Sequence, residues 1–243
     1  DRIYRNVRGK ALILATIGTE DLEKGVRMVI SHIDSPRLDL KPNPLYEEGG
    51  LALFKTHYYG GVKKYQWTAL PLALHGTVVR KDGTVLDVVI GEDAGDPVFC
   101  VTDLLPHLAK DQMTKTLSEG IKGEQLNVVV GSRPYPDEKV KEKIKLNILS
   151  LLHEKYGLVE GDFLSAELTM VPAGAARDVG FDRSMIGSYG HDDKVCAYTS
   201  LRAAMDVAAP AFTSVTVFAD KEEICSDGNT GLFSDFLKIF VED

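Results

Sequence analysis

The most constraining feature of this chain is an apolar, strand-like run that ends abruptly in acidic residues. Residues 214–219 (SVTVFA) alternate and are rich in β-branched side chains, which is typical of a buried strand, and the chain continues as DKEE. Ligands bind at the carboxyl ends of strands in open α/β sheets, so acids here are placed for chemistry. Neighbouring side chains on extended backbone point to opposite sides, so Glu222 and Glu223 are expected to have different roles. One could ligate a cation while the other acts on a water bound to it, although two solvated acids in a surface turn would show the same pattern.

A second strand-like run ends in a histidine and an aspartate. Residues 10–18 and 25–31 predict two strands, and the second is so continuously apolar that we expect it in the centre of a sheet. His32 and Asp34 follow, and Pro36 cannot continue a central strand. Two residues apart on extended backbone, His32 and Asp34 project to the same side. Asp34 could therefore hold the second imidazole nitrogen and fix the tautomer for metal binding, although a solvated turn is the alternative.

The middle of the chain has a different character. Pro, Gly and aromatic residues between 40 and 65 suggest that the chain leaves one structural unit and enters another. Three short β-like runs with a hairpin-type turn at 81–84 then predict an all-β, barrel-like insertion; they cover residues 72–80, 85–90 and 98–102. Within it, His107 lies in a segment that could open a short helix and contribute to a neighbouring subunit's site. A structural histidine is the simpler interpretation.

Two helices are predicted in the second half. Residues 137–156 show helical spacing of apolar side chains, with acids at the start and a stop at Gly157. Residues 195–205 predict the other helix, so Asp192 and Asp193 lie in its first turn or cap it. Capping would explain one of the two, whereas the other carboxylate could bridge two cations. Together the strand and helix ends offer imidazole and carboxylate donors that suit Zn, Mn or Co.

Charge and cysteine usage exclude several classes of protein. Of 243 residues, 44% are hydrophobic and 26% charged, a globular balance, with length for one large domain or two ordinary ones. A net charge of −8 without dense Lys/Arg clusters argues against nucleic acid as a partner. No apolar run has membrane-spanning length, so no membrane partner is expected. The three cysteines show no CxxC spacing, which predicts neither disulfides nor a thiolate zinc site and favours the cytoplasm.

Three segments resemble, in order and spacing, the aspartyl-aminopeptidase-like family of dinuclear metallo-aminopeptidases. They are residues 32–36 (HIDSP), 192–198 (DDKVCAY) and 220–226 (DKEEICS), and residues 58–61 (YYGG) with Trp67 are also similar to that family. The resemblance covers nearly the whole chain but only the first half to two-thirds of a typical member. It implies an α/β, zinc-peptidase-like catalytic domain with a mixed sheet flanked by helices, interrupted by a β-rich, barrel-like dimerisation domain. The implied ranges are 1–47 and 172–243 for the catalytic domain and 48–171 for the insertion.

Carried over position by position, the resemblance also implies a set of roles. His32 would ligate one metal and Asp34 would orient His32, while Asp192 would bridge both metals. Glu223 would ligate the second metal, and Glu222 would be the general base. The cofactors would be two divalent ions, zinc in the first place, with cobalt or manganese as alternatives.

The reaction implied is hydrolysis of N-terminal residues from peptides by a hydroxide that the two metals share. The family's name suggests a preference for acidic residues. The implied assembly is a tetrahedral homo-dodecamer built from dimers, with the active sites facing inside.

Two features of this chain differ from the family pattern. A further Asp ligand and a further His ligand are expected beyond Asp243, so each metal would have two protein ligands from this chain. Cys225 stands where the family usually has Gly, and a thiol there could alter metal preference or sensitivity to oxidation. The missing ligands leave open a catalytically silent metallopeptidase-like assembly or peptide-binding subunit. A carboxylate-rich phosphoesterase is a weaker alternative, because no basic phosphate clamp is visible near the motifs.

Overall fold

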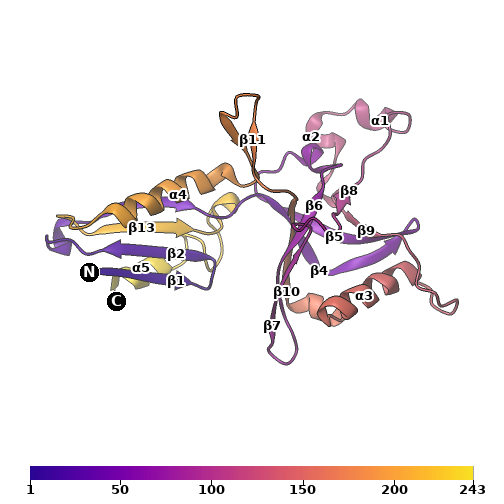
Figure 1. Ribbon diagram of the computed structural model, residues 1–243, viewed down its shortest axis with the longest axis horizontal. Coiled ribbons are helices and arrows are strands. Elements are labelled where there is room, and N and C mark those ends of the chain that lie inside the picture. The colour runs from indigo at the N-terminus through magenta and orange to yellow at the C-terminus, as the bar shows by residue number, and fades with distance from the viewer. Residues whose placement is uncertain (243) are drawn as a thin grey trace. The chain divides into compact units, whose positions relative to one another are not determined.

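The chain divides into two compact units, which a computed structural model describes over residues 1–242 (Figure 1). The first unit contains Asp1–Pro36 and Ile186–Asp243, and the second contains Arg37–Met185. The predicted insertion, residues 48–171, falls inside the second unit. That unit begins earlier because β4 (Arg37–Glu48) pairs along its length with β5 (Leu51–Tyr59).

The first unit is built on a four-stranded mixed sheet in the order β1-β2-β13-β3. Its strands are β1 (Arg2–Val7), β2 (Ala11–Thr16), β3 (Arg27–His32) and β13 (Ser214–Ala219). β13 runs antiparallel to β2 and parallel to β3, with Ala219 opposite His32. The carboxyl ends of β3 and β13 therefore meet at the same edge of the sheet, which is the edge where α/β proteins bind ligands.

Helices cover both faces of this sheet. β13 is buried almost throughout, as its sequence predicts, and Val217 and Ile13 have no exposed surface. These two side chains form an apolar cluster with Phe236 of α5 (Phe236–Glu242). The alternate residues of the strands face the other way, towards α4 (His191–Asp206), where Thr216 of β13 and Met205 of α4 line the same hollow. The predicted mixed sheet flanked by helices is confirmed.

β3 does not have the central, buried position that its apolar run predicts. Met28, Val29 and Ile30 are 41%, 47% and 47% exposed, and β3 is the last strand of its sheet within residues 1–242. An apolar run indicates that a strand can be buried on both faces, but it does not locate the elements that would cover it. The prediction of a central strand is therefore wrong for the described residues.

The second unit is a seven-stranded antiparallel sheet in the order β7-β6-β10-β4-β5-β9-β8. Besides β4 and β5 it contains β6 (Leu72–Val79), β7 (Val85–Ile90), β8 (Cys100–Val101), β9 (Val128–Gly131) and β10 (Ala166–Pro172). The predicted hairpin between β6 and β7 is confirmed. A separate antiparallel bridge joins Leu72 to Phe99, so the start of β6 lies beside the residue that precedes β8. The sheet thus curls towards closure, in keeping with a barrel-like insertion.

The helices of the second unit are α1 (Lys110–Met113), α2 (Leu117–Gly120) and α3 (Lys143–Tyr156). α3 ends at Gly157 as predicted, with Gly157 in the left-handed conformation at φ 66°. Its predicted start at residue 137 is wrong, because the Glu47 carboxylate caps the helix by accepting the N–H groups of Ile144 and Lys145 at 2.8 and 3.1 Å. His107 lies in a turn before α1 and does not open a helix.

β11 (Arg177–Val179) and β12 (Met185–Gly187) pair in a short two-stranded sheet. This sheet follows β10 and precedes α4 in the sequence. Within residues 1–242, none of the helices combines the length and the apolar character needed to cross a bilayer.

Candidate metal centre

His32 stands at the centre of a group of carboxylates at the shared edge of β3 and β13. Its Nε2 lies 3.1 Å from Asp192 Oδ1 and 3.6 Å from Glu222 Oε2. On the other side of the ring, Nδ1 lies 3.0 Å from the backbone oxygen of Asp34 and 3.4 Å from its Oδ1. The His32 side chain is only 11% exposed. The structure thus brings together four of the predicted site residues, from three segments far apart in the sequence.

Asp34 joins the imidazole to the acidic turn after β13. Asp34 is buried, and its two carboxylate oxygens accept the backbone N–H groups of Glu222 and Glu223, each at 3.2 Å. The same carboxylate faces His32 Nδ1. A buried carboxylate with several donors is held in one orientation, so Asp34 can fix both the ring of His32 and the path of the glutamate turn.

The two glutamates are not on extended backbone, which corrects the argument from alternating side chains. Glu222–Ile224 form a single 3₁₀ turn between Lys221 and Cys225, whose φ angles of 67° and 62° are left-handed. These two residues reverse the chain directly after β13. The Glu222 side chain is 54% exposed and its Oε2 approaches His32, whereas Glu223 is placed by its N–H bond to Asp34. Separate roles for the two acids stay a prediction, because alternation no longer supports them.

Asp192 and Asp193 precede the regular part of α4. Both have non-helical backbone angles, and the peptide bond between them is cis. The Asp193 carboxylate accepts the backbone N–H of His32 at 3.3 Å, so it ties the helix start to β3. This corrects the expectation that one of the two acids acts as a helix cap. The Asp192 side chain is 86% exposed and reaches His32 Nε2, while its backbone oxygen accepts the Ser35 hydroxyl at 3.2 Å.

The charges around His32 change its protonation. Burial of the imidazole lowers its pKa, but the hydrogen bond to the Asp34 backbone, the charges of Asp34 and Glu222 and the hydrogen bond to Asp192 outweigh burial. The pKa of His32 is therefore raised above its ordinary value. The hydrogen bond to Asp193 likewise raises the pKa of the Cys196 thiol. Acidic residues at this sheet edge thus raise both pKa values, that of His32 through the Asp34 backbone as well as through carboxylates.

The atoms around His32 Nε2 fit part of a zinc site. Zinc binds imidazole nitrogen and carboxylate oxygen at about 2.0–2.2 Å, so two ligands of a tetrahedral site lie about 3.3 Å apart. The 3.1 Å between His32 Nε2 and Asp192 Oδ1 is close to this spacing. No group of three or more His, Cys, Asp or Glu side chains in residues 1–242 is arranged to hold a metal by itself. His32 and Asp192 are thus a pair of side chains that could hold a metal ion together with further ligands.

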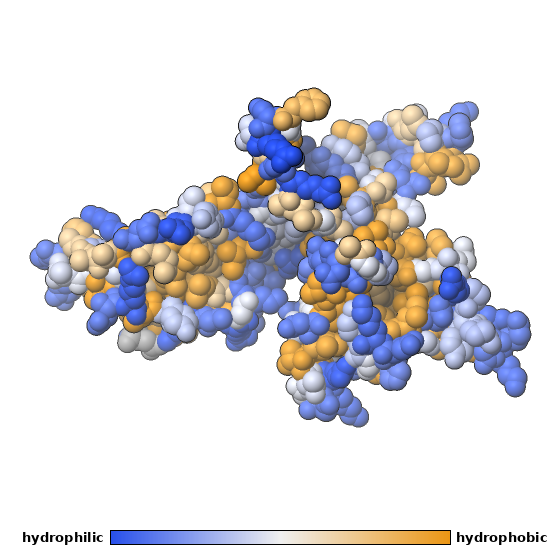
Figure 2. Space-filling view, viewed as in Figure 1, coloured by the Kyte–Doolittle hydropathy of each residue, from blue (hydrophilic) through white to orange (hydrophobic). Residues whose placement is uncertain are grey.

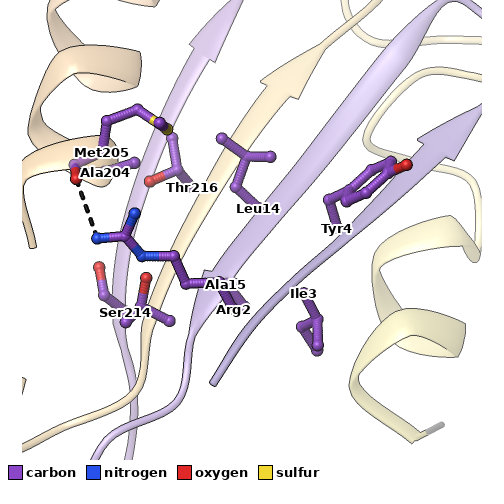
Figure 3. A pocket seen from close by; sticks show the side chains of 10 residues that line it. Arg2, Ile3, Tyr4, Leu14, Ala15, Ala204, Met205, Ser214 and Thr216 are labelled. Carbon is purple, nitrogen blue, oxygen red and sulfur yellow. Dashed lines mark hydrogen bonds between the residues drawn. The ribbon is translucent and has the colours of Figure 1, made fainter. Parts of the chain in front are cut away.

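A separate hollow on the same unit has a different character. It lies between β1, β2, the start of β13 and the end of α4, and its lining is mostly apolar (Figure 3). Arg2 closes one side by donating to the Met205 carbonyl at 3.0 Å. No His, Cys, Asp or Glu lines it, so it offers no imidazole, thiolate or carboxylate side chain to a metal. His107 lies in the second unit, and its predicted role stays a prediction.

Comparisons with known proteins identify relatives along the whole chain. The model of a protein family described as aminopeptidase I zinc metalloprotease (M18) matches residues 1–243. A probable M18 family aminopeptidase 1 from Clostridium acetobutylicum is 54% identical over 243 residues, which are 100% of this chain and 52% of the relative.

Solved structures match as well. The crystal structure of aminopeptidase I from Clostridium acetobutylicum has a TM-score of 0.93 at 51% identity, covering 100% of this chain and 53% of that one. The crystal structure of an M18 family aminopeptidase from Thermotoga maritima has a TM-score of 0.92 at 49% identity, covering 98% and 52%. The chain thus spans about half the length of the relatives it matches.

Proposed function

Because this chain belongs to the aminopeptidase I zinc metalloprotease (M18) family, we propose that the protein carrying it removes N-terminal residues from peptides in a zinc-dependent hydrolysis. The observation that carries the proposal is the convergence of an imidazole and three carboxylates, those of Asp34, Asp192 and Glu222, at the ends of β3 and β13. An imidazole between carboxylates at the ligand-binding edge of a sheet is a typical metallohydrolase arrangement.

His32 and Asp192 would hold metal, as their spacing supports, and Glu223 would supply a ligand to a second ion. Two divalent ions, zinc or otherwise cobalt or manganese, are part of the proposal, together with an Asp and a His from outside residues 1–243. When bound, such ions lower the pKa of a water and stabilise negative charge on the peptide carbonyl oxygen. Asp34 would keep His32 in the tautomer whose Nε2 is free to ligate.

Glu222 would move the protons. Its Oε2 lies 3.6 Å from His32 Nε2, and the side chain is half exposed, so it can reach both the centre and a substrate. It would take a proton from the attacking water and deliver it to the nitrogen of the leaving peptide. Glu223, whose N–H is bound to Asp34, would stay in place as a ligand during this transfer.

The finer properties of the protein belong to the same proposal. A preference for acidic N-terminal residues and a tetrahedral homo-dodecamer built from dimers follow from the resemblance in the sequence, and a cytoplasmic location follows from the cysteine usage. Self-association is supported by β7, the last strand of its sheet within residues 1–242, where Val85 and Val89 are 62% and 51% exposed. Figure 2 shows further hydrophobic residues at the surface of the second unit. In such an assembly His107 would contribute to a neighbouring subunit's site.

The test is hydrolysis of aminoacyl-nitroanilides by the full-length protein, with zinc analysis of the same preparation. We expect release of nitroaniline that a chelator stops and zinc restores, and faster release from Asp or Glu than from Leu substrates. A zinc-free protein without turnover would favour the alternative, a catalytically silent assembly or peptide-binding subunit. We retain this second candidate function because residues 1–242 do not form a complete group of metal ligands.

A further inference from the structure

The backbone of the glutamate turn is held in an unusual conformation. Lys221, Cys225 and Ser226 all have left-handed φ angles, of 67°, 62° and 59°, although none of them is glycine. L-residues disfavour this region, so such a turn persists only where its surroundings impose it. The N–H of Ser226 donates to the carbonyl of Lys221 at 2.7 Å and closes the turn, but this bond joins two residues of the turn itself. Contacts from outside must hold it against the sheet.

Asp34 supplies one such contact, and the segment Gly228–Gly231, which we call the return segment, supplies another. A Cβ atom on Gly231 would lie 2.1 Å from the Ser226 carbonyl oxygen, so the two backbones touch directly. No side chain fits between them. The return segment therefore packs against Ser226, at the end of the turn.

A buried hydrogen bond holds the return segment to the sheet. The hydroxyl of Thr230 donates to the carboxylate of Asp220, the residue directly after β13. The two residues are 3% and 5% exposed. A buried carboxylate needs a donor, and a hydrogen bond to a charged group is among the stronger ones in proteins. β13 pairs with β2 and β3 on its two sides, so the sheet holds the backbone that leads into Asp220 in place.

We propose that the buried hydrogen bond between Thr230 and Asp220 is a positioning contact that keeps the Glu222–Glu223 turn seated on Asp34. Asp220 and Thr230 are neither metal ligands nor proton carriers in the proposed centre; they act through the return segment on Ser226 and hence on the turn. A catalytic effect of this contact rests on the proposed function. Its effect on the position of the turn does not, because the contacts that define it are all within the chain.

The test uses the full-length protein with Thr230→Val, which removes the hydroxyl at nearly constant volume, and Thr230→Ser, which restores it. Hydrogen exchange read by mass spectrometry reports the backbone N–H groups of residues 221–226, including those bound to Asp34. We expect Thr230→Val to speed exchange there by about tenfold or more, and Thr230→Ser to return it to within about twofold of the wild type. The same variants should lower and restore kcat by similar factors while KM stays within about twofold.

Thr213→Val is the matched control. Thr213 is a buried threonine of the same unit whose hydroxyl oxygen accepts the Gly18 N–H at 3.0 Å. Its loss should weaken the fold generally yet leave exchange of residues 221–226 and kcat within about twofold of the wild type. Wild-type exchange in Thr230→Val, or an equal effect of Thr213→Val on the turn, would overturn the proposal.

The proposed zinc-dependent hydrolysis and the proposed role of Thr230 can fail separately. If the wild type has no zinc-dependent turnover, the proposed function fails, and the exchange measurement still decides whether Thr230 holds the turn. If Thr230→Val does not fold, Thr230→Ala takes its place, since it also removes the hydroxyl that donates to Asp220. Exchange of residues 221–226 at the wild-type rate in Thr230→Ala would then contradict the proposal.

Discussion

The carboxylate of Asp34 accepts the backbone N–H of Glu222 at 3.2 Å, across 188 residues of sequence. The same carboxylate lies 3.4 Å from His32 Nδ1 and also accepts the N–H of Glu223. One buried side chain thus sets the orientation of the imidazole and the position of both glutamates. Changes to this carboxylate or to the residues it holds should therefore alter metal binding or turnover.

Replacing Asp34 should weaken metal binding without removing a metal ligand. In Asp34→Asn, the amide nitrogen cannot accept one of the two N–H groups, and the charge that faces His32 is lost. We expect zinc affinity to fall by about 10–100-fold, the usual effect of losing a carboxylate behind a ligating histidine. Competition with a chromogenic chelator measures it. Asp39→Asn, which breaks the 2.8 Å ion pair with Arg37 in the second unit, is the control and should bind zinc like the wild type.

Glu222→Gln should lower turnover strongly while leaving zinc binding intact. The amide keeps the size of the side chain but cannot take a proton, so kcat should fall by about 10²–10⁴-fold. Zinc content should be unchanged. Glu124→Gln, which removes the carboxylate paired with Lys41 in the second unit, provides a matched loss of charge and should keep full activity. Turnover retained in Glu222→Gln with intact zinc would remove Glu222 from the mechanism.

The raised pKa of His32 predicts a pH dependence with a definite sign. Because the folded value lies above 6.5, protonated His32 contributes stability to the metal-free protein below that pH and loses it as pH rises through the folded pKa. Zinc needs the neutral ring, so zinc affinity should rise by up to about tenfold per pH unit over the same interval. Chelator competition and thermal unfolding over about pH 6–8 test both trends. In His32→Gln both should flatten; an unchanged slope would exclude His32 as the titrating group.

Cys225→Gly should stabilise the protein. Cys225 has a φ of 62°, a conformation that glycine adopts freely and other L-residues disfavour. After the larger entropy of glycine in the unfolded chain is subtracted, we expect a gain of about 0.5–1 kcal/mol in the free energy of unfolding. Cys196→Gly is the control, because it places glycine inside α4 and should destabilise the protein instead. Denaturant unfolding of both variants gives the signs, and a loss of stability in Cys225→Gly would contradict the geometry.

The parts of the site that the sequence could predict are those set by local patterns. The alternation of residues 214–219 predicts β13, and Pro36 predicts the end of the segment after β3. Since β3 and β13 are parallel neighbours, two correctly placed strand ends are enough to bring His32 and Glu222 together. The family resemblance agrees with this placement.

The parts that could not be predicted depend on partners far along the chain. Nothing local to Lys221 indicates a left-handed turn, because the turn is held by its contacts with Asp34 and with the return segment. The late start of α3 depends on Glu47, about a hundred residues earlier. Asp193 resembles a helix cap in the sequence, yet its carboxylate binds the backbone of His32. In each case a tertiary hydrogen bond overrides the local preference.

In the proposed centre, His32 and Asp192 bind one metal ion. An anomalous difference map at the zinc edge, from crystals of the full-length protein grown with zinc, tests this directly. We expect a peak within ligand distance of both His32 Nε2 and an Asp192 carboxylate oxygen, which lie 3.1 Å apart. A zinc peak bound by other residues, with His32 and Asp192 still bonded directly to each other, would contradict it.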